Sequence, residues 1–308
     1  MATTADAAPL SATRKRILGI GRQAVLQAMA IAVLLTVLFP VVWVVSLSLD
    51  PLNRSRPEGL SIIPSNASLE AYAQVIRQPT NNPIGFVGLA LNSLKIAVGS
   101  SLVSVLIGVS AAYAFSRLRF RGREVLMLAI LGVLMLPAVA TLTPLFTLLN
   151  QVSLELPVLG RFNLRNSLLG VGLAIVSGLL PFAIWNLKGY LDTIPRDLEE
   201  AAAVDGASIN QTFLRVILPL AVPALAVTAF LGFVSGWTEF YFSWMFLTNL
   251  AQDQTLAMAL YSMQGQFTST PWSLFSAFAI MFAIPPAIVY LLAQRWITSG
   301  LAIGAVKG

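Results

Sequence analysis

The chain has 308 residues, of which 57% are hydrophobic and 10% are charged, with a net charge of +6. A soluble domain usually carries about 25% charged residues, so the composition excludes a soluble fold and predicts one domain that faces lipid. Cysteine and histidine are both absent, which removes disulfides, thiolate chemistry, the commonest metal ligand and the commonest general base.

Six apolar segments are long enough to cross a bilayer, which takes about 20 helical residues. They run from about Ala24 to Leu49, Phe86 to Phe115, Glu124 to Leu149, Asn166 to Leu187, Leu218 to Leu247 and Trp272 to Trp296. The first segment is longer than the apolar core of a signal peptide and no small-residue cleavage site closes it, so we expect a retained helix. The sequence therefore predicts an all-α polytopic membrane protein with six transmembrane helices.

The basic residues predict the orientation of these helices. If the N-terminus lies inside, 13 of the 19 Lys and Arg residues fall on inner segments, five on outer segments, and Lys95 within a span. This bias places both termini in the cytoplasm and explains the positive charge without nucleic acid. The chain then divides into an N-terminal cytoplasmic segment (1–23), a transmembrane domain (24–296) and a cytoplasmic tail (297–308). The arginine cluster at 117–123 fits this orientation signal, and lipid or partner binding is the alternative.

The first outer segment contains five prolines between positions 51 and 83, which prevent a long helix. A short helix over Ser68–Arg77, with Ser68 as its N-cap, is still expected there.

The cytoplasmic loop at 188–218 predicts two short helices joined by a glycine turn. Pro195 suits the first turn of the first helix, and the acidic residues that follow it are favoured by the helix dipole. Gly206 can adopt the left-handed conformation that ends a helix. Ser208 and Gln211 form a capping box that starts the second helix.

The surface of this loop would suit a partner protein. Ala201 and Ala202 permit close approach, and the acidic residues would attract basic groups. Phe213 lies at the centre of an apolar stripe that begins at Ile209. We therefore expect a docking site for a cytoplasmic protein. The alternative is a loop that packs only on its own helices.

The same residues carry a resemblance. Glu200-Ala201-Ala202, Gly206 and Val216-x-Leu218-Pro219 resemble the EAA motif of bacterial ABC importer permeases, with valine in place of isoleucine. The segments 92–95, 112–117 and 294–308 are similar to carbohydrate importer permeases, especially the smaller maltose permease, the MalG type. The resemblance covers nearly all of the chain after Ala24.

The resemblance implies a type I ABC importer permease in the bacterial cytoplasmic membrane. Its partners would be a second homologous permease, two ATP-binding subunits and an extracytoplasmic substrate-binding protein. The substrate would be maltose, maltodextrin or a similar oligosaccharide, and another sugar or glycerol phosphate is the alternative. The residues expected to couple to the ATPase are Glu199, Glu200, Ala201, Ala202, Asp205, Gly206, Phe213 and Pro219, and those of the tail that would touch it are Gly304, Lys307 and Gly308.

The energy source is expected in another chain. No G-x-x-x-x-G-K-[ST] phosphate-binding loop occurs, so the chain is expected to be no enzyme and to bind no cofactor or metal. ATP and magnesium would be held by the partner ATPase subunits. A stand-alone secondary transporter would use charged groups within the membrane, and only Lys95 and Glu239 qualify, which disfavours that alternative.

Two further groups of residues are candidates for substrate or partner contacts. Trp237, Glu239 and Tyr241 have the stacking and hydrogen-bonding chemistry of a sugar path, and an interhelical hydrogen bond with aromatic packing is the alternative. The outer loop at 248–271 is a candidate docking loop for the binding protein, and an ordinary interfacial loop is the alternative. Its candidate residues are Tyr261, Gln264, Gln266 and Phe267.

Overall fold

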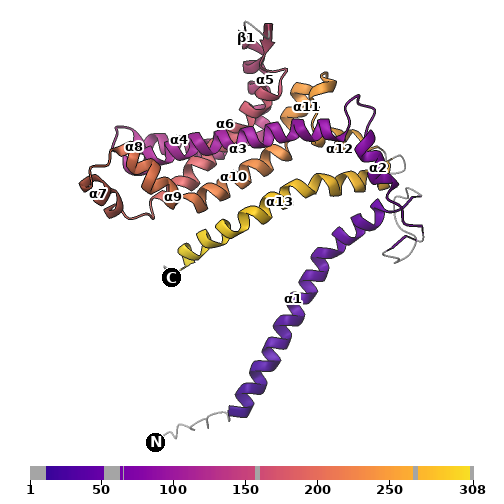
Figure 1. Cartoon of the computed structure of the whole chain (residues 1–308), viewed down its shortest axis with the longest axis horizontal. Helices are drawn as coiled ribbons and strands as arrows, with labels where there is room; N and C mark the ends of the chain where they lie inside the picture. The colour runs from indigo at the N-terminus through magenta and orange to yellow at the C-terminus, as the bar shows by residue number, and fades with distance from the viewer. Residues whose placement is uncertain (1–11, 52–62, 65, 157–159, 266–269, 306–308) are drawn as a thin grey trace, which may run out of the picture.

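The computed structural model describes residues 12–51, 63–64, 66–156, 160–265 and 270–305. Figure 1 shows long helices lying side by side, with a small hairpin at one end. The long elements are α1 (Ala12–Ser48), α3 (Phe86–Arg117), α6 (Leu168–Leu191), α10 (Val222–Trp237) and α13 (Trp272–Ala305). The shorter ones are α2 (Glu70–Arg77), α4 (Arg123–Leu134), η1 (Ala138–Thr141), α5 (Leu142–Gln151), α7 (Asp197–Val204), α8 (Ile209–Thr212), the π-helix η2 (Phe213–Ile217), α9 (Leu218–Leu220), α11 (Tyr241–Leu247), η3 (Ala251–Asp253) and α12 (Leu256–Ser262).

Four helices in the described part of the chain are long and apolar enough to cross a membrane without a break. They are Gln23–Ser48 within α1, Phe86–Arg117, Leu168–Leu191 and Trp272–Trp296, and each overlaps a predicted span. Two bent pairs of helices bring the number to at most six if each pair is counted as one span. The sequence therefore located the apolar segments correctly, but it did not show that two of them are bent.

The third and fifth predicted spans are not continuous helices. In the third, Arg123–Leu134 and Val139–Gln151 meet at 101° around Pro137, which has no N–H to donate within a helix. In the fifth, Ile209–Leu220 and Val222–Trp237 meet at 74°, between Pro219 and Pro223. The fifth also stops at Trp237 and resumes as α11 four residues later.

Helix α3 lies at the centre of the bundle, where α6 and α10 both pack on it, and α13 packs on α10. Its contact with α10 depends on small residues, since Gly232 lies against Ser101, and Gly236 against Ala97 and Ser100. Ser101 Oγ also donates a hydrogen bond to the Ala229 carbonyl at 2.7 Å. Small residues that let backbones approach closely are typical of helix packing in membranes.

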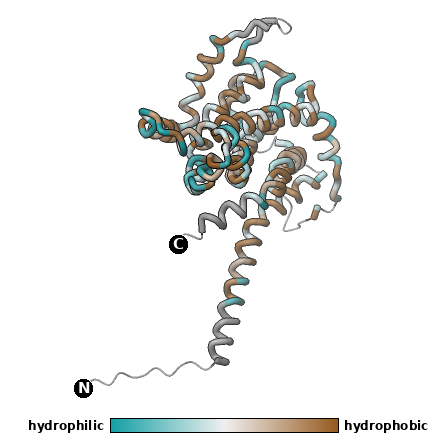
Figure 2. Tube along the Cα trace, turned by 60° about the vertical axis from the view of Figure 1, so that its left-hand side comes forward, coloured by the Kyte–Doolittle hydropathy of each residue, from teal (hydrophilic) through white to brown (hydrophobic). Residues whose placement is uncertain are grey.

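Helix α1 departs from the bundle. Figure 1 shows it leaning away from the other helices, and Figure 2 shows mostly apolar residues along the coloured part of it. It contacts α13, where Ser273 Oγ donates to the Ser48 carbonyl at 3.4 Å. The most apolar window of its span is 0% buried within this chain, so nearly the whole surface of this span is left to lipid or to another protein.

The segments predicted to lie outside the membrane confirm one predicted helix and add an unexpected element. The short helix expected over Ser68–Arg77 is present as α2, although its N-cap is Leu69, and the Ser68 hydroxyl accepts a hydrogen bond from the Glu70 N–H at 3.1 Å. The strands β1 (Ser153–Leu156) and β2 (Gly160–Asn163) form an antiparallel hairpin, so the chain is not purely helical. The alternation of polar and apolar residues in β1 has the period of a strand.

The C-terminal helix extends further than predicted. Helix α13 continues to Ala305, although the sequence placed the start of a tail at residue 297. Pro285 and Pro286 lie inside α13 without ending it.

Candidate functional site

The loop at 188–218 forms the predicted helix, glycine turn and helix. Helix α7 ends at Val204, its C-cap is Asp205, and Gly206 follows with a left-handed φ of 83°. The Gly206 and Ala207 N–H groups donate to the carbonyls of Ala203 at 3.0 Å and Ala202 at 2.9 Å, which is the Schellman pattern of a helix C-terminus. The Ser208–Gln211 capping box is formed in both directions. Local hydrogen bonds therefore fix the turn between α7 and α8.

One face of the loop points outward. Among the described residues, α7 contains none that is buried, and Glu200, Ala201, Asp205 and Gly206 are exposed while Ala202 is half-buried. Apolar side chains accompany them: Val204 is 88% exposed, and Leu198, Ile209 and Leu214 are also exposed. Exposed apolar side chains beside exposed acidic ones are compatible with a protein interface.

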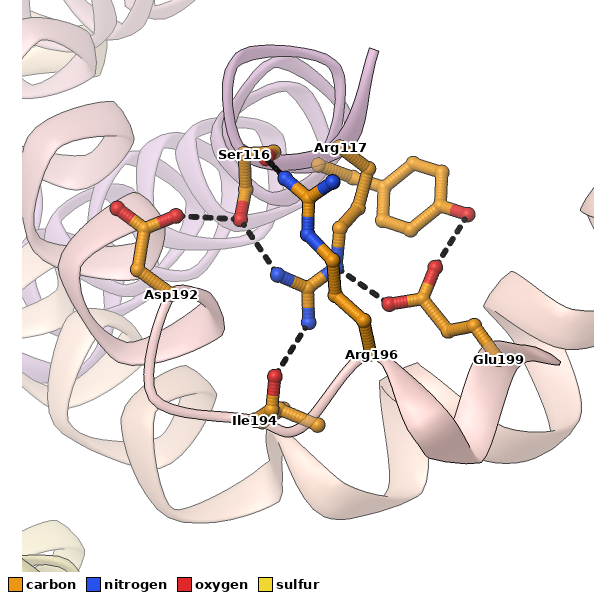
Figure 3. Close-up of polar contacts among 7 residues, drawn as sticks. Ser116, Arg117, Asp192, Ile194, Arg196 and Glu199 are labelled. Atoms are coloured by element: carbon orange, nitrogen blue, oxygen red, sulfur yellow. Dashed lines mark hydrogen bonds and ion pairs between the residues drawn. The ribbon is translucent and has the colours of Figure 1, made fainter. Parts of the chain in front are cut away.

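The other face is attached to the bundle through Glu199. Its carboxylate forms an ion pair with Arg117 Nε, at the end of α3, and the exposed fractions of the two side chains are 17% and 7%. Arg117 Nη2 also donates to the Ile194 carbonyl at 2.9 Å, in the segment that leads into α7. Figure 3 shows the guanidinium between α3 and the loop. Glu199 is thus turned toward its own chain, whereas Glu200 is exposed.

Two further polar residues extend this contact. Ser116 Oγ accepts a hydrogen bond from Arg117 Nη1 at 3.1 Å and donates one to Asp192 Oδ1 at 2.6 Å, as Figure 3 shows. Lys188 Nζ donates to Asp192 Oδ2 at 2.6 Å. Burial opposes ionisation of Asp192, but the hydrogen bonds from Lys188 and Ser116 and the positive charge of Lys188 and Arg117 prevail, so the pKa of this carboxyl is below its ordinary value.

Phe213 also faces inward. Its ring lies 4.8 Å from the ring of Tyr113 on α3, measured between centroids, and it packs against a buried cluster that includes Leu187, Leu191 and Ile217. The expected apolar stripe therefore splits: Phe213 attaches the loop to the bundle, while Ile209 is exposed. Pro219, which is also exposed, lies at the bend that leads into α10.

The sequence did not identify Ser116, Arg117, Asp192 or Ile194 as part of this site. The available signal was opposite charge: an arginine ends one predicted helix and acidic residues start another on the same side of the membrane. Spacing along the chain could not show which carboxylate the arginine meets. As to metals, no group of three or more metal-binding side chains is found among the residues that the structure describes.

The three candidates for a substrate path lie in different environments. Trp237 is 2% exposed and its indole N–H donates to the Phe282 carbonyl at 3.0 Å. The Glu239 carboxylate accepts hydrogen bonds from the N–H groups of Phe242 at 2.6 Å and Ser243 at 2.9 Å, so it caps the start of α11. Tyr241 is 63% exposed. Only Tyr241 of the three is open to a ligand.

Part of the predicted outer docking loop is described. Tyr261 is exposed, with its ring 4.6 Å from Phe240 and 5.1 Å from Trp244 between centroids. Gln264 is exposed and lines a pocket of about 650 Å³ with residues such as Asn82 and Gln254. Gln266, Phe267, Lys307 and Gly308 lie outside the described residues, and Gly304 lies within α13.

Comparison with known proteins identifies close relatives. A family model described as "Binding-protein-dependent transport system inner membrane component" matches residues 104–303. The maltose/maltodextrin transport system permease protein MalG of Yersinia pestis is 35% identical over 280 residues, which are 88% of this chain and 89% of that protein. The trehalose/maltose transport system permease protein MalG of Thermococcus litoralis is 35% identical over 281 residues, which are 91% and 95% of the two chains.

Solved structures share the fold. A chain of a bacterial ABC transporter involved in the import of the acidic polysaccharide alginate has a TM-score of 0.72 at 24% identity, over 94% of this chain and 99% of that one. A chain of the bacterial alginate ABC transporter in complex with alginate pentasaccharide-bound periplasmic protein has a TM-score of 0.66 at 15% identity, over 90% and 95% of the two chains.

Proposed function

Because this chain belongs to the family of binding-protein-dependent transport system inner membrane components, we propose that it is the transmembrane permease subunit of an ATP-driven sugar importer. The observation that carries the proposal is the loop at 188–218, whose fixed turn presents exposed acidic and apolar side chains. A face of this kind suits a partner that delivers force, since the turn is braced by its own hydrogen bonds.

The proposed substrate is maltose, maltodextrin or a similar oligosaccharide. This rests on the relatives named for maltose and trehalose transport, which are about 35% identical over most of the chain. Another sugar or glycerol phosphate would use the same architecture. A distinguishing measurement is competition for uptake of labelled maltose by the assembled importer: an excess of unlabelled maltodextrin should reduce the uptake, and an excess of glycerol phosphate should not.

The proposed coupling step takes place at the exposed face of the loop. Glu200, Ala201, Ala202, Asp205 and Gly206 would seat in an ATP-binding subunit, and ATP and magnesium would be bound there. Closure of two such subunits would then rock the helices between two packed arrangements. Gly304, Lys307 and Gly308 at the C-terminus are proposed to contact the same subunits.

The proposed assembly contains a second, homologous permease. Helix α1 supports it, because the most apolar part of its span has no residue buried within its own chain and is available to pack against another membrane subunit. With each bent pair counted as one, six spans cross the membrane and both termini are cytoplasmic, in accord with the distribution of Lys and Arg.

On the outer side we propose that a substrate-binding protein docks on the loop at 248–271. Tyr261 and Gln264 are exposed there, and Gln266 and Phe267 follow in the chain. Tyr241 lies nearby in sequence and in the same aromatic cluster through Phe240, so it is proposed to face the substrate path. Trp237 and Glu239 are already engaged within the chain and are assigned to its internal packing.

The decisive experiment reconstitutes this chain in liposomes with and without its partners. We expect no uptake of labelled maltose by the chain alone, and uptake that requires ATP, the second permease and the binding protein when all subunits are present. The chain should also co-purify with an ATPase from its native membrane. Uptake by the chain alone would refute the proposal, because it would reveal a stand-alone transporter.

A further inference from the structure

In the proposed function, a movement of the loop at 188–218 must reach α3 at the centre of the bundle. The chain connections of the loop alone do not carry the movement there. Through the chain, α7 is joined to α6 by the segment at 192–196 and to α10 through α8, η2 and α9. Neither connection reaches α3, although α3 is the helix on which both α6 and α10 pack. A displacement of the loop would reach α3 only through non-covalent contacts.

Arg117 provides such a contact at the last residue of α3. Its guanidinium bonds to α7 through Glu199, to the segment before α7 through the Ile194 carbonyl, and to its neighbour Ser116. All three nitrogens of the guanidinium are therefore bonded. This arrangement restricts rotation of the guanidinium and separation of α7 from α3. Arg196 Nη2 adds a longer hydrogen bond of 3.4 Å to the Ser116 carbonyl, and Figure 3 shows these groups converging between α3 and the loop.

The environment of the pair separates it from an ordinary surface ion pair. Exposed pairs contribute little because water and salt screen them, whereas Arg117 and Glu199 are both largely shielded from water. Removing one partner of a shielded pair leaves the other charge uncompensated. The next arginine in the chain, Arg119, is exposed and provides a matched comparison of the same residue type.

We propose that Arg117 and Glu199 form a latch that makes the coupling helix α7 and the end of α3 move as one body, so that both are positioning residues for energy coupling. The inference rests on the proposed function. The two adjacent carboxylates then have different roles: Glu200 faces the ATPase, and Glu199 binds the end of the chain's own α3. Ser116 supports the latch, because its hydroxyl accepts from Arg117 and donates to Asp192 at the end of α6.

The test measures one distance in the assembled importer. Because the chain has no cysteine, a Ser110→Cys, Ala203→Cys pair can carry two spin labels, one on α3 and one on α7, at exposed positions. In the parent chain we expect a narrow distance distribution that is the same without nucleotide and with ATP trapped. In Arg117→Ala, Glu199→Ala and the double variant the distribution should broaden to the same extent, and sugar imported per ATP hydrolysed should fall about fivefold or more, the lower end of typical coupling between two sites.

Controls separate the latch from a general loss of structure. Arg119→Ala should leave both readouts unchanged, and Arg117→Lys, which keeps the charge but not the fork, should give intermediate values. If an alanine variant fails to insert, Glu199→Gln makes the same comparison with its shape retained. A distance that changes between the two states of the parent chain, or an unchanged distribution and ratio in the alanine variants, would overturn the latch.

A further variant distinguishes this inference from the proposed function. Glu200→Lys should reduce co-purification of the ATPase, because its carboxylate is exposed on the docking face. If the parent chain assembles with an ATPase while the Arg117 and Glu199 variants behave normally, the latch alone is wrong. If no ATPase assembles with the parent chain, the proposed function itself is wrong.

Discussion

A Gly236→Ala substitution should test the close contact of α10 with α3. A Cβ at this position would lie 2.7 Å from Ala97 Cα and 2.6 Å from Ser100 Oγ, both closer than two such atoms can approach. Ser100 could rotate away only by giving up its hydrogen bond to the Ile96 carbonyl, at 2.7 Å, and the Ala97 backbone cannot yield without shifting α3. Overpacking of this kind costs about 1–3 kcal/mol of the free energy of unfolding.

The measurement is reversible unfolding of the chain in mixed micelles, followed by tryptophan fluorescence. The matched control is Gly178→Ala in α6, where the added Cβ would meet no atom within 4 Å; alanine is also the better helix former. The control should unfold at or above the denaturant concentration of the parent chain, whereas Gly236→Ala should unfold at a lower one. Equal midpoints for the two alanine variants would show that α3 and α10 do not approach this closely.

Three further substitutions test other parts of the structure. Gly206→Pro should abolish binding of the ATPase while membrane insertion is retained, because proline cannot adopt a φ of 83° and has no N–H for the Ala203 carbonyl; pull-down and insertion assays would check this, and normal binding would contradict the docking role. Trp237→Phe should lower the free energy of unfolding by about 0.5–1.5 kcal/mol through loss of its hydrogen bond to Phe282, without altering substrate selectivity; a change in selectivity would return Trp237 to the substrate path. Asp192 has a lowered pKa in the folded state, so its contribution to stability is present above the ordinary aspartate pKa and is lost as pH falls through the folded value. The difference in free energy of unfolding between the parent chain and Asp192→Asn should therefore be constant near neutral pH and shrink in acid.

The local structure of the loop could be predicted because its signals are local. Gly206 and the Ser208–Gln211 capping box each act within four residues, so their effects do not depend on the rest of the fold. The apolar spans were found for a similar reason, since the requirement of the bilayer applies to each segment separately. The bends at Pro137 and between Pro219 and Pro223 were harder, because Pro181 lies inside α6 and Pro285 inside α13 without breaking them. Whether a proline ends a helix depends on whether neighbouring groups can hydrogen-bond to the backbone carbonyl that the proline leaves without a partner.

Contacts between residues far apart in the chain could not be predicted from the sequence. Glu199 and Glu200 are neighbours of the same type, and only the packing of α7 beside α3 decides which one meets Arg117. Phe213 and Ile209 lie on one predicted apolar stripe, yet Phe213 packs on Tyr113 while Ile209 is exposed. Similarly, Glu239 was predicted to lie within a continuous span, but the end of α10 at Trp237 converts it into the cap of α11.

The two sides of the loop at 188–218 have a consequence for how importers of this family diversify. The exposed residues Glu200 and Asp205 are proposed to match a partner, whereas Glu199 and Phe213 contact this chain's own α3. The two requirements fall on different side chains, so one set can be exchanged without the other. Grafting only the outward residues from another permease should therefore transfer the choice of ATP-binding subunit. Several permeases in one cell could then share one ATP-binding subunit while each keeps its own substrate pathway.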